Sequence, residues 1–187
     1  MNFLKKPLVW VLIVLVVLGI WAASSYNRFV SLSQSADTQW AQVENQFQRR
    51  YDLVPNLVAA VKGSFKQEQE VFAAIDAART HYAGASTVEG KVGAANELES
   101  SLGRLLVITE NYPQLTSQAN VRALMDELAG TENRIAVERG RYNETVQSYN
   151  VAVKSFPGVI TASLFGYHER ALFNAAIGAE NAPKVDL

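Results

Sequence analysis

The sequence predicts an all-α protein, in which an N-terminal transmembrane helix is followed by an elongated antiparallel up-and-down four-helix bundle and a short helical tail. Three observations predict it. Residues 7–23 carry no charged or polar side chain. From Tyr26 onward, apolar residues recur at alternating steps of three and four positions, which is the period of an α-helix. No segment alternates convincingly between apolar and polar residues, as a half-buried strand would.

Residues 1–25 are the predicted membrane anchor. A helix over residues 7–25 is about long enough to cross a hydrocarbon core of ~30 Å. Trp10 and Trp21 lie near its two ends, and tryptophan is enriched where lipid meets water. The lipid bilayer is therefore the first predicted partner, contacted through residues 7–25.

A cleavable signal peptide is the alternative interpretation of this segment. Lys5 and Lys6 give it a basic start, and residues 22–25 supply small side chains of the kind that signal peptidase needs. However, the apolar run is long for a signal peptide, and the helical pattern resumes at Tyr26 without a spacer. We therefore expect the anchor to be retained.

The basic residues around the span predict its orientation. Lys5 and Lys6 precede the span, whereas Arg28 is the one basic residue in the next twenty positions. Basic flanks tend to stay in the cytoplasm. We therefore expect a single-pass protein of the inner (cell) membrane, with the bundle on the extracytoplasmic side.

Residues 26–156 form the predicted bundle. Its first helix can continue the membrane helix directly. The helix carries a narrow apolar seam of coiled-coil type, formed by Tyr26, Phe29, Ser33, Ala36, Trp40, Val43 and Phe47. Pro55 disfavours helical geometry at the residue before it. Asp52 is therefore predicted to cap a second helix that carries Pro55 in its first turn.

Capping residues and helix breakers predict the other helix ends. The second helix is expected to end before His81. Ser86 begins a capping-box pattern with the glutamate three residues later, which opens the third helix. That helix is expected to stop near Pro113. The fourth helix is predicted over about 119–155, and residues 157–187 form the short helical tail.

The composition excludes several functional classes. The chain has 17 basic and 18 acidic residues, a formal net charge of −1, and it lacks the basic stripe that nucleic-acid binding requires. It contains no Cys, so a thiol nucleophile is excluded. Gly84 to Lys91 superficially resembles a phosphate-binding loop, but five residues separate its glycines and Val92 replaces the required Ser or Thr. We expect no nucleic-acid partner.

Metal-binding and catalytic patterns are also missing from the sequence. Di-metal bundles use Glu-x-x-His on two helices, and no Glu of this chain has a His three residues later. His81 is expected in a loop and His168 in the tail. No Gly-x-Ser-x-Gly motif occurs. We therefore predict that the chain has no metal ion, no cofactor and no catalytic residue. The protein is expected to be non-enzymatic.

Polar residues on the helices are the candidates for an interaction site. The set comprises Arg49, Arg50, Asp52, Asn56, Glu68, Glu132, Asn133 and Arg134. Glu68 lies at a seam position, among apolar neighbours, as do Arg79, Thr131 and Glu138. A charged side chain is costly at such a position unless it is paired. Two interpretations stay open: the seam turns and leaves these residues at the bundle edge, or they form an interhelical network or a partner-binding stripe.

Several blocks of the sequence resemble the LemA family. The blocks are Arg49–Val58, Val61–Gly63, Glu110–Pro113 with Leu115, Glu127–Leu128, Thr131–Ile135, Tyr142–Asn143, Tyr149–Asn150 and Phe156–Pro157. They follow the family's order and extend over nearly the whole soluble part. Ser64 and Gln67 depart from the Tyr and His that are common in the family at these positions.

The resemblance implies a membrane helix followed by a long antiparallel bundle, and a role in organising membranes. It carries over no reaction and no catalytic residue. It also implies an N-terminal segment outside the cell, opposite to the orientation that the basic residues predict. The orientation therefore stays open at this point.

The leading functional hypothesis is a membrane-anchored, non-enzymatic scaffold that associates with itself or with another membrane protein. An anchored domain confined to a plane gains effective concentration for lateral association. The alternative is a regulatory or accessory subunit of a membrane protease or signalling protein. An enzyme assembled from scattered residues is the third class, because a fold alone does not specify a reaction.

Overall fold

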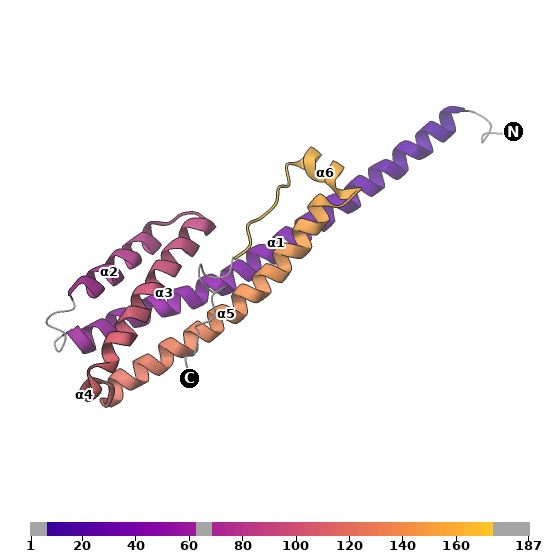
Figure 1. Ribbon diagram of the computed structural model, residues 1–187. Helices are drawn as coiled ribbons and strands as arrows, with labels where there is room; N and C mark the ends of the chain where they lie inside the picture. Colours follow the sequence, from indigo (N-terminus) through magenta and orange to yellow (C-terminus); the bar gives the residue numbers. More distant parts are fainter. Residues whose placement is uncertain (1–6, 63–68, 174–187) are drawn as a thin grey trace, which may run out of the picture. The chain divides into compact units, whose positions relative to one another are not determined.

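The structure, a computed structural model, describes residues 7–62 and 69–173 and contains six α-helices and no strand in these ranges. The helices are α1 (Pro7–Lys62), α2 (Gln69–Gly84), α3 (Val88–Glu110), α4 (Pro113–Thr116), α5 (Ala119–Lys154) and α6 (Gly158–Phe165) (Figure 1). The all-α prediction is confirmed, as is a long apolar helix at the N-terminal end.

The chain divides into two compact units, and both α1 and α5 contribute to each of them. The terminal unit comprises, in its described part, residues 7–41 and 140–172. The central unit comprises residues 42–139 and Phe173, again in its described part. Each unit is built around its own set of buried side chains.

Helix α1 is one continuous helix of 56 residues that includes Pro55. The predicted helix break at Asp52 is therefore wrong. A proline inside a helix removes one hydrogen bond and crowds the preceding turn. Val54 and Leu57 on either side of Pro55 are fully buried in the central core, and their packing offsets that local cost. The first bundle helix does continue the apolar N-terminal helix directly.

The central unit has an apolar core to which four helices contribute. Its buried members are Val54, Leu57 and Val61 of α1, Phe72, Ile75 and Ala78 of α2, Leu98, Leu102 and Leu105 of α3, and Val121 and Leu128 of α5. Helices α2 and α3 pack against each other over their length. The spacing of these residues by three, four or seven along each helix is what places them on one face.

Helix α2 ends at Gly84, so the predicted end before His81 is wrong. The extra turn buries Tyr82, whose ring centroid lies 6.0 Å from that of Phe47 and 5.9 Å from that of Tyr51. Aromatic pairs at this separation stabilise beyond the area they bury. Phe47 itself is buried, as the seam predicts.

Thr87, and not Ser86, caps the N-terminus of α3. Its side chain accepts a hydrogen bond from the backbone N–H of Gly90 at 3.1 Å. A capping side chain bonds to the second or third residue of its helix, so this cap begins the helix at Val88. Two adjacent hydroxyl residues compete for one cap, and the sequence pattern selected the wrong one. The predicted helix end near Pro113 is confirmed, since α3 ends at Glu110.

The terminal unit has a smaller core. Its buried members are Phe29 of α1, Tyr149, Ala152 and Val153 of α5, and Ala162 of α6. Trp40, another predicted seam residue, is half-buried, and its ring centroid lies 5.9 Å from that of Tyr142. Gly166 ends α6 in the left-handed conformation, with φ of 73°, which favours glycine because it has no Cβ.

Candidate functional site

The structure separates the eight predicted interaction residues into different environments. Glu68 lies outside the described residues. Arg50 is buried, with 4% of its surface exposed. The exposed members are Arg49, Asp52, Asn56, Glu132, Asn133 and Arg134.

Arg50 is a charged side chain inside the central unit. Its Nη1 lies 3.8 Å from Oε2 of Glu99, and its Nε has no hydrogen-bond partner within the described part of the chain. Burial lowers the pKa of Arg50 from its usual value, while the carboxylates of Glu99 and Glu132 act in the opposite direction. A buried charge with one long ion pair is costly to keep.

A cavity of about 290 Å³ opens beside Arg50. Its lining consists of Arg50, Glu99 and Glu132 together with Leu57, Leu102, Gly103, Leu106, Leu128 and Ala129. This lining combines an apolar wall with one cation and two carboxylates, a composition that suits the binding of one apolar side chain with a polar end. The polar groups of its lining are thus one guanidinium and two carboxylates.

The turn from Thr131 to Arg134 presents one side chain inward and three outward. Thr131 is fully buried, and its hydroxyl donates a hydrogen bond to the Leu128 carbonyl at 2.6 Å. Arg134 Nη2 lies 3.3 Å from Oε1 of Glu127. The same Glu127 oxygen pairs with Arg49. The structure thus brings Arg49 and Arg134 together on one carboxylate, which forms an exposed polar cluster of α1 and α5.

Asp52 and Asn56 are not part of that cluster. The Asp52 carboxylate accepts a hydrogen bond from Gln48 Nε2 at 2.9 Å within α1, and both residues are exposed. A bond between residues four apart on one helix supports that helix locally. The candidate residues therefore do not share one environment: Arg50 is buried, Arg49 and Arg134 belong to the exposed cluster, and Asp52 makes a contact within its own helix.

Arg139 is a central polar residue that the sequence reasoning missed. Its Nη2 donates a hydrogen bond to Asn96 Oδ1 at 3.0 Å and forms an ion pair with Glu99 Oε2 at 3.5 Å. Its guanidinium also lies 5.4 Å from the ring centroid of Phe47. A signal existed, because Arg139 falls four residues after the buried Ile135 and three before the buried Tyr142. At a position between buried residues of α5, a charged side chain is expected to have a partner on a neighbouring helix.

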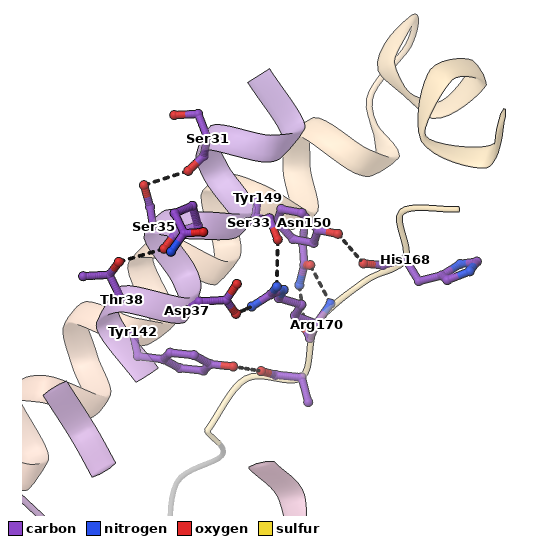
Figure 2. A network of polar contacts seen from close by, with 12 residues as sticks. Ser31, Ser33, Ser35, Asp37, Thr38, Tyr142, Tyr149, Asn150, His168 and Arg170 are labelled. Atoms are coloured by element: carbon purple, nitrogen blue, oxygen red, sulfur yellow. Dashed lines mark hydrogen bonds and ion pairs between the residues drawn. The ribbon is translucent and has the colours of Figure 1, made fainter. Parts of the chain in front are cut away.

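Arg170 is the second missed residue, and it holds the segment after α6 against the terminal unit (Figure 2). Its Nη1 donates to Asp37 Oδ1 at 2.6 Å, and its Nη2 donates to Ser33 Oγ at 2.8 Å. The hydrogen bond to Asp37 raises the pKa of Arg170 above its usual value. Charge-assisted bonds of this length are strong.

Backbone contacts of α5 side chains complete this attachment. Asn150 Oδ1 accepts from the Arg170 N–H at 2.9 Å, and Asn150 Nδ2 donates to the Arg170 carbonyl at 2.8 Å. The Tyr149 hydroxyl donates to the His168 carbonyl at 2.9 Å (Figure 2). A side-chain amide that pairs with both backbone groups of one residue fixes an extended chain as a strand partner would.

In residues 7–62 and 69–173, no group of three or more His, Asp or Glu side chains is placed to hold a metal ion. His81 lies in α2, and not in the expected loop, with its Nδ1 at 2.8 Å from Glu97 Oε2. His168 is exposed after α6. The described polar clusters are thus ion pairs and hydrogen bonds between helices.

Fold and site together define a class: all-helical proteins whose apolar N-terminal helix continues into a helical domain with polar clusters between its helices. The model of the LemA family matches residues 39–187. The chain belongs to the LemA family, as the sequence blocks predict.

Three relatives are magnetosome proteins. MamQ 2 and MamQ 1 of Paramagnetospirillum magneticum (strain ATCC 700264 / AMB-1) are each 26% identical over 174 residues, which cover 79% of this chain and 64% of the relative. MamQ of Magnetospirillum gryphiswaldense (strain DSM 6361 / JCM 21280 / NBRC 15271 / MSR-1) is 26% identical over 175 residues, 80% of this chain and 64% of the relative. The chain thus spans 64% of the length of the curated relatives it matches.

Proposed function

We propose that this LemA-family protein is a membrane-anchored, non-enzymatic scaffold. Residues 1–25 hold it in the inner membrane, the bundle of residues 26–156 stands on the extracytoplasmic side, and residues 157–187 form a tail. Its partner is a second copy of the chain or another membrane protein. The process it serves is the organisation of a membrane.

The exposed apolar surface of α1 carries the proposal. An 18-residue stretch near the N-terminus of α1 is apolar enough to cross a membrane, and none of it is buried. Leu8, Leu15 and Ile20 are among its exposed side chains. Large contiguous apolar patches on protein surfaces mark contacts with a membrane or a partner. Because α1 continues without a break to Lys62, the anchor joins the bundle through one helix.

Two features support a scaffold over a bare anchor. The relatives are named magnetosome proteins, which agrees with the role in organising membranes that the family resemblance implies. The exposed cluster of Arg49, Glu127 and Arg134 offers charges for lateral contacts. Proteins confined to a membrane plane need little intrinsic affinity for such contacts, because their effective concentration is high.

A regulatory or accessory subunit of a membrane protease or signalling protein is the second candidate function. The cavity beside Arg50 favours it, since about 290 Å³ suits a single protruding side chain of one specific partner. A scaffold that associates through flat helix surfaces does not need such a cavity.

Crosslinking in intact membranes separates these candidates. The sequence contains no Cys, so Asn133→Cys introduces a single thiol on the exposed side of the α5 turn. A crosslinker that attaches to this thiol at one end and photochemically to any neighbouring side chain at the other should then give adducts of the chain with itself, which favour a scaffold, or adducts with one different protein, which favour a regulator. Glu144→Cys, exposed elsewhere on α5, is the matched control for chance collision. Equal adduct yields from both positions would contradict the proposed binding surface.

A further inference from the structure

Helix α6 exposes its more apolar face. Leu164 is 74% exposed, and Val159 and Ile160 are also exposed. The residues that α6 buries are Thr161 and Ala162. A surface helix in water normally shows the reverse pattern, with its apolar stripe turned to the core. At 100° per residue, Val159, Ile160 and Leu164 lie on the face opposite to the buried one.

Phe156, two positions before the helix, extends this surface. Phe156 is 81% exposed, although phenylalanine is among the residues most often buried in proteins. Together, Phe156, Val159, Ile160 and Leu164 form what is called here the α6 patch. Thr161 and Ala162 face the terminal core, so the patch is the outward surface of a helix that is held in place from behind.

Helix α6 lies beside α1 within the same terminal unit (Figure 1). The Phe165 ring centroid is 5.0 Å from that of Tyr26. Gly158 lies against Phe29, whose ring atom would be 3.5 Å from a Cβ at that position. Phe156 and Trp21 line one cavity of about 150 Å³.

Trp21 places α6 relative to a bilayer. Tryptophan near the end of a membrane helix sits at the level of the lipid headgroups, and Phe156 shares a cavity with it. Phe156 and Trp21 thus bring the start of α6 to the level of the headgroups. A short helix beside Trp21 therefore reaches the boundary between headgroups and acyl chains.

We propose that α6 is an interfacial helix, and that the α6 patch inserts into the bilayer surface on the side of the bundle. The proposal rests on the membrane anchor of the proposed function. Lipid is the occupant to which the structure points, because Phe156 of the patch lines one cavity with Trp21, at the end of the exposed apolar run of α1 in the same unit. Arg28, exposed and lining the same cavity as Trp21, supplies a cation for an anionic headgroup.

Depth-dependent fluorescence quenching tests this placement. Leu164→Cys in the full-length, otherwise Cys-free chain is labelled with an environment-sensitive dye. The protein is then reconstituted into vesicles of phosphatidylethanolamine and phosphatidylglycerol, with and without spin-labelled lipid. We expect several-fold stronger quenching by the spin-labelled lipid than at Val107→Cys, an equally apolar and exposed position on α3 of the central unit. Ile160→Cys should behave like Leu164→Cys.

Leu15→Cys, in the apolar run of α1, is the control for the anchor. If Leu15→Cys is quenched while Leu164→Cys and Ile160→Cys match Val107→Cys, α6 stands in water and the inference is wrong, whereas the anchor holds. If Leu15→Cys is not quenched, the anchor and this inference both fail. If unlabelled Leu164→Cys forms a disulfide-linked dimer in the vesicles on oxidation, while the labelled protein is not quenched, the patch contacts a second copy and the lipid contact is overturned.

Discussion

Arg50 is a charged residue whose side chain is buried, so that desolvation disfavours its charge. Its side chain is buried, and within the described residues its guanidinium has one ion pair, with Glu99 at 3.8 Å. Replacing both partners of a buried ion pair with apolar residues is often neutral or stabilising by about 1–4 kcal/mol, whereas removing one partner is costly when the other charge stays buried. The Glu99 side chain is 37% exposed and also lies 3.5 Å from Arg139, so the loss of Arg50 leaves no buried unpaired charge. The retention of arginine there is more readily explained by partner recognition at the adjacent cavity than by stability.

Arg50→Met tests that explanation. We expect the free energy of unfolding to stay equal or to rise, because methionine fills the space without a charge to desolvate. Thermal or urea unfolding of the detergent-solubilised protein measures it. Arg50→Ala is the matched comparison, and it should destabilise because it leaves the site unfilled. A loss of about 3 kcal/mol or more in Arg50→Met would show that the pairing with Glu99 holds the fold together.

Tyr82 gives the fold a dependence on pH. Burial raises the pKa of Tyr82 from 10.0 to about 12, and the Glu44 carboxylate adds to the shift. The folded state therefore favours the protonated phenol. The resulting stabilisation is present below pH 10, the unfolded value, and is lost as the pH rises toward the folded value of about 12.

Comparing Tyr82→Phe with the unsubstituted chain isolates this contribution. Two pKa units correspond to roughly 2–3 kcal/mol, so the unsubstituted chain should lose about that much more stability than Tyr82→Phe as the pH rises from about 9 to about 12. At neutral pH the substitution should cost little, because the Tyr82 hydroxyl has no hydrogen-bond partner within the described residues. Parallel urea titrations would measure both. Identical pH profiles for the two proteins would contradict a buried phenol.

At the scale of the elements, α1 joins two tasks in one helix. Its first part is apolar and exposed, and its last turns supply Val54, Leu57 and Val61 to the central core. A peptidase cut after the small residues 22–25 would separate the apolar part from the helix that the bundle needs. Because the helix is continuous across these residues, we expect the anchor to be retained.

N-terminal analysis of the mature protein tests the retention of the anchor. We expect Met1 or Asn2 at the N-terminus, since the membrane helix and the bundle are one element. Intact mass of the purified membrane fraction provides an independent measurement. A mature protein that begins at Ser24, Ser25 or Tyr26 would show that the segment is a signal peptide.

The sequence predicted the helices well where apolar periodicity and helix breakers agreed. It located the end of α3 and the full length of α5, and it identified Phe47 as buried. It misplaced the features that depend on competition between local and tertiary effects. Local geometry suggested a helix end before Pro55, but the buried neighbours of this proline keep α1 intact.

The candidate site was less predictable for a related reason. Arg50 was identified from sequence, but its burial depends on three helices that meet around it. Arg139 and Arg170 were missed because their partners are distant in the chain: 43 residues separate Arg139 from Asn96, and 133 residues separate Arg170 from Asp37. One sequence shows the charge of a residue and its helical phase, but the partner across the interface is fixed only by packing.

At the scale of the whole molecule, membrane orientation decides which partners can be reached. Two lysines precede the span and one arginine follows it, which favours a cytoplasmic N-terminus and an extracytoplasmic bundle. Proteinase added outside an intact inner membrane should therefore degrade residues 26–187 and leave the cytoplasmic end protected.

The measurement uses a short epitope at each terminus. The C-terminal epitope should disappear in intact spheroplasts, and the N-terminal epitope should disappear only after the membrane is permeabilised. If the C-terminal epitope survives until permeabilisation, the bundle faces the cytoplasm. The extra positive charge before the span would then be too small to set the topology, and a cytoplasmic partner would replace an extracytoplasmic one.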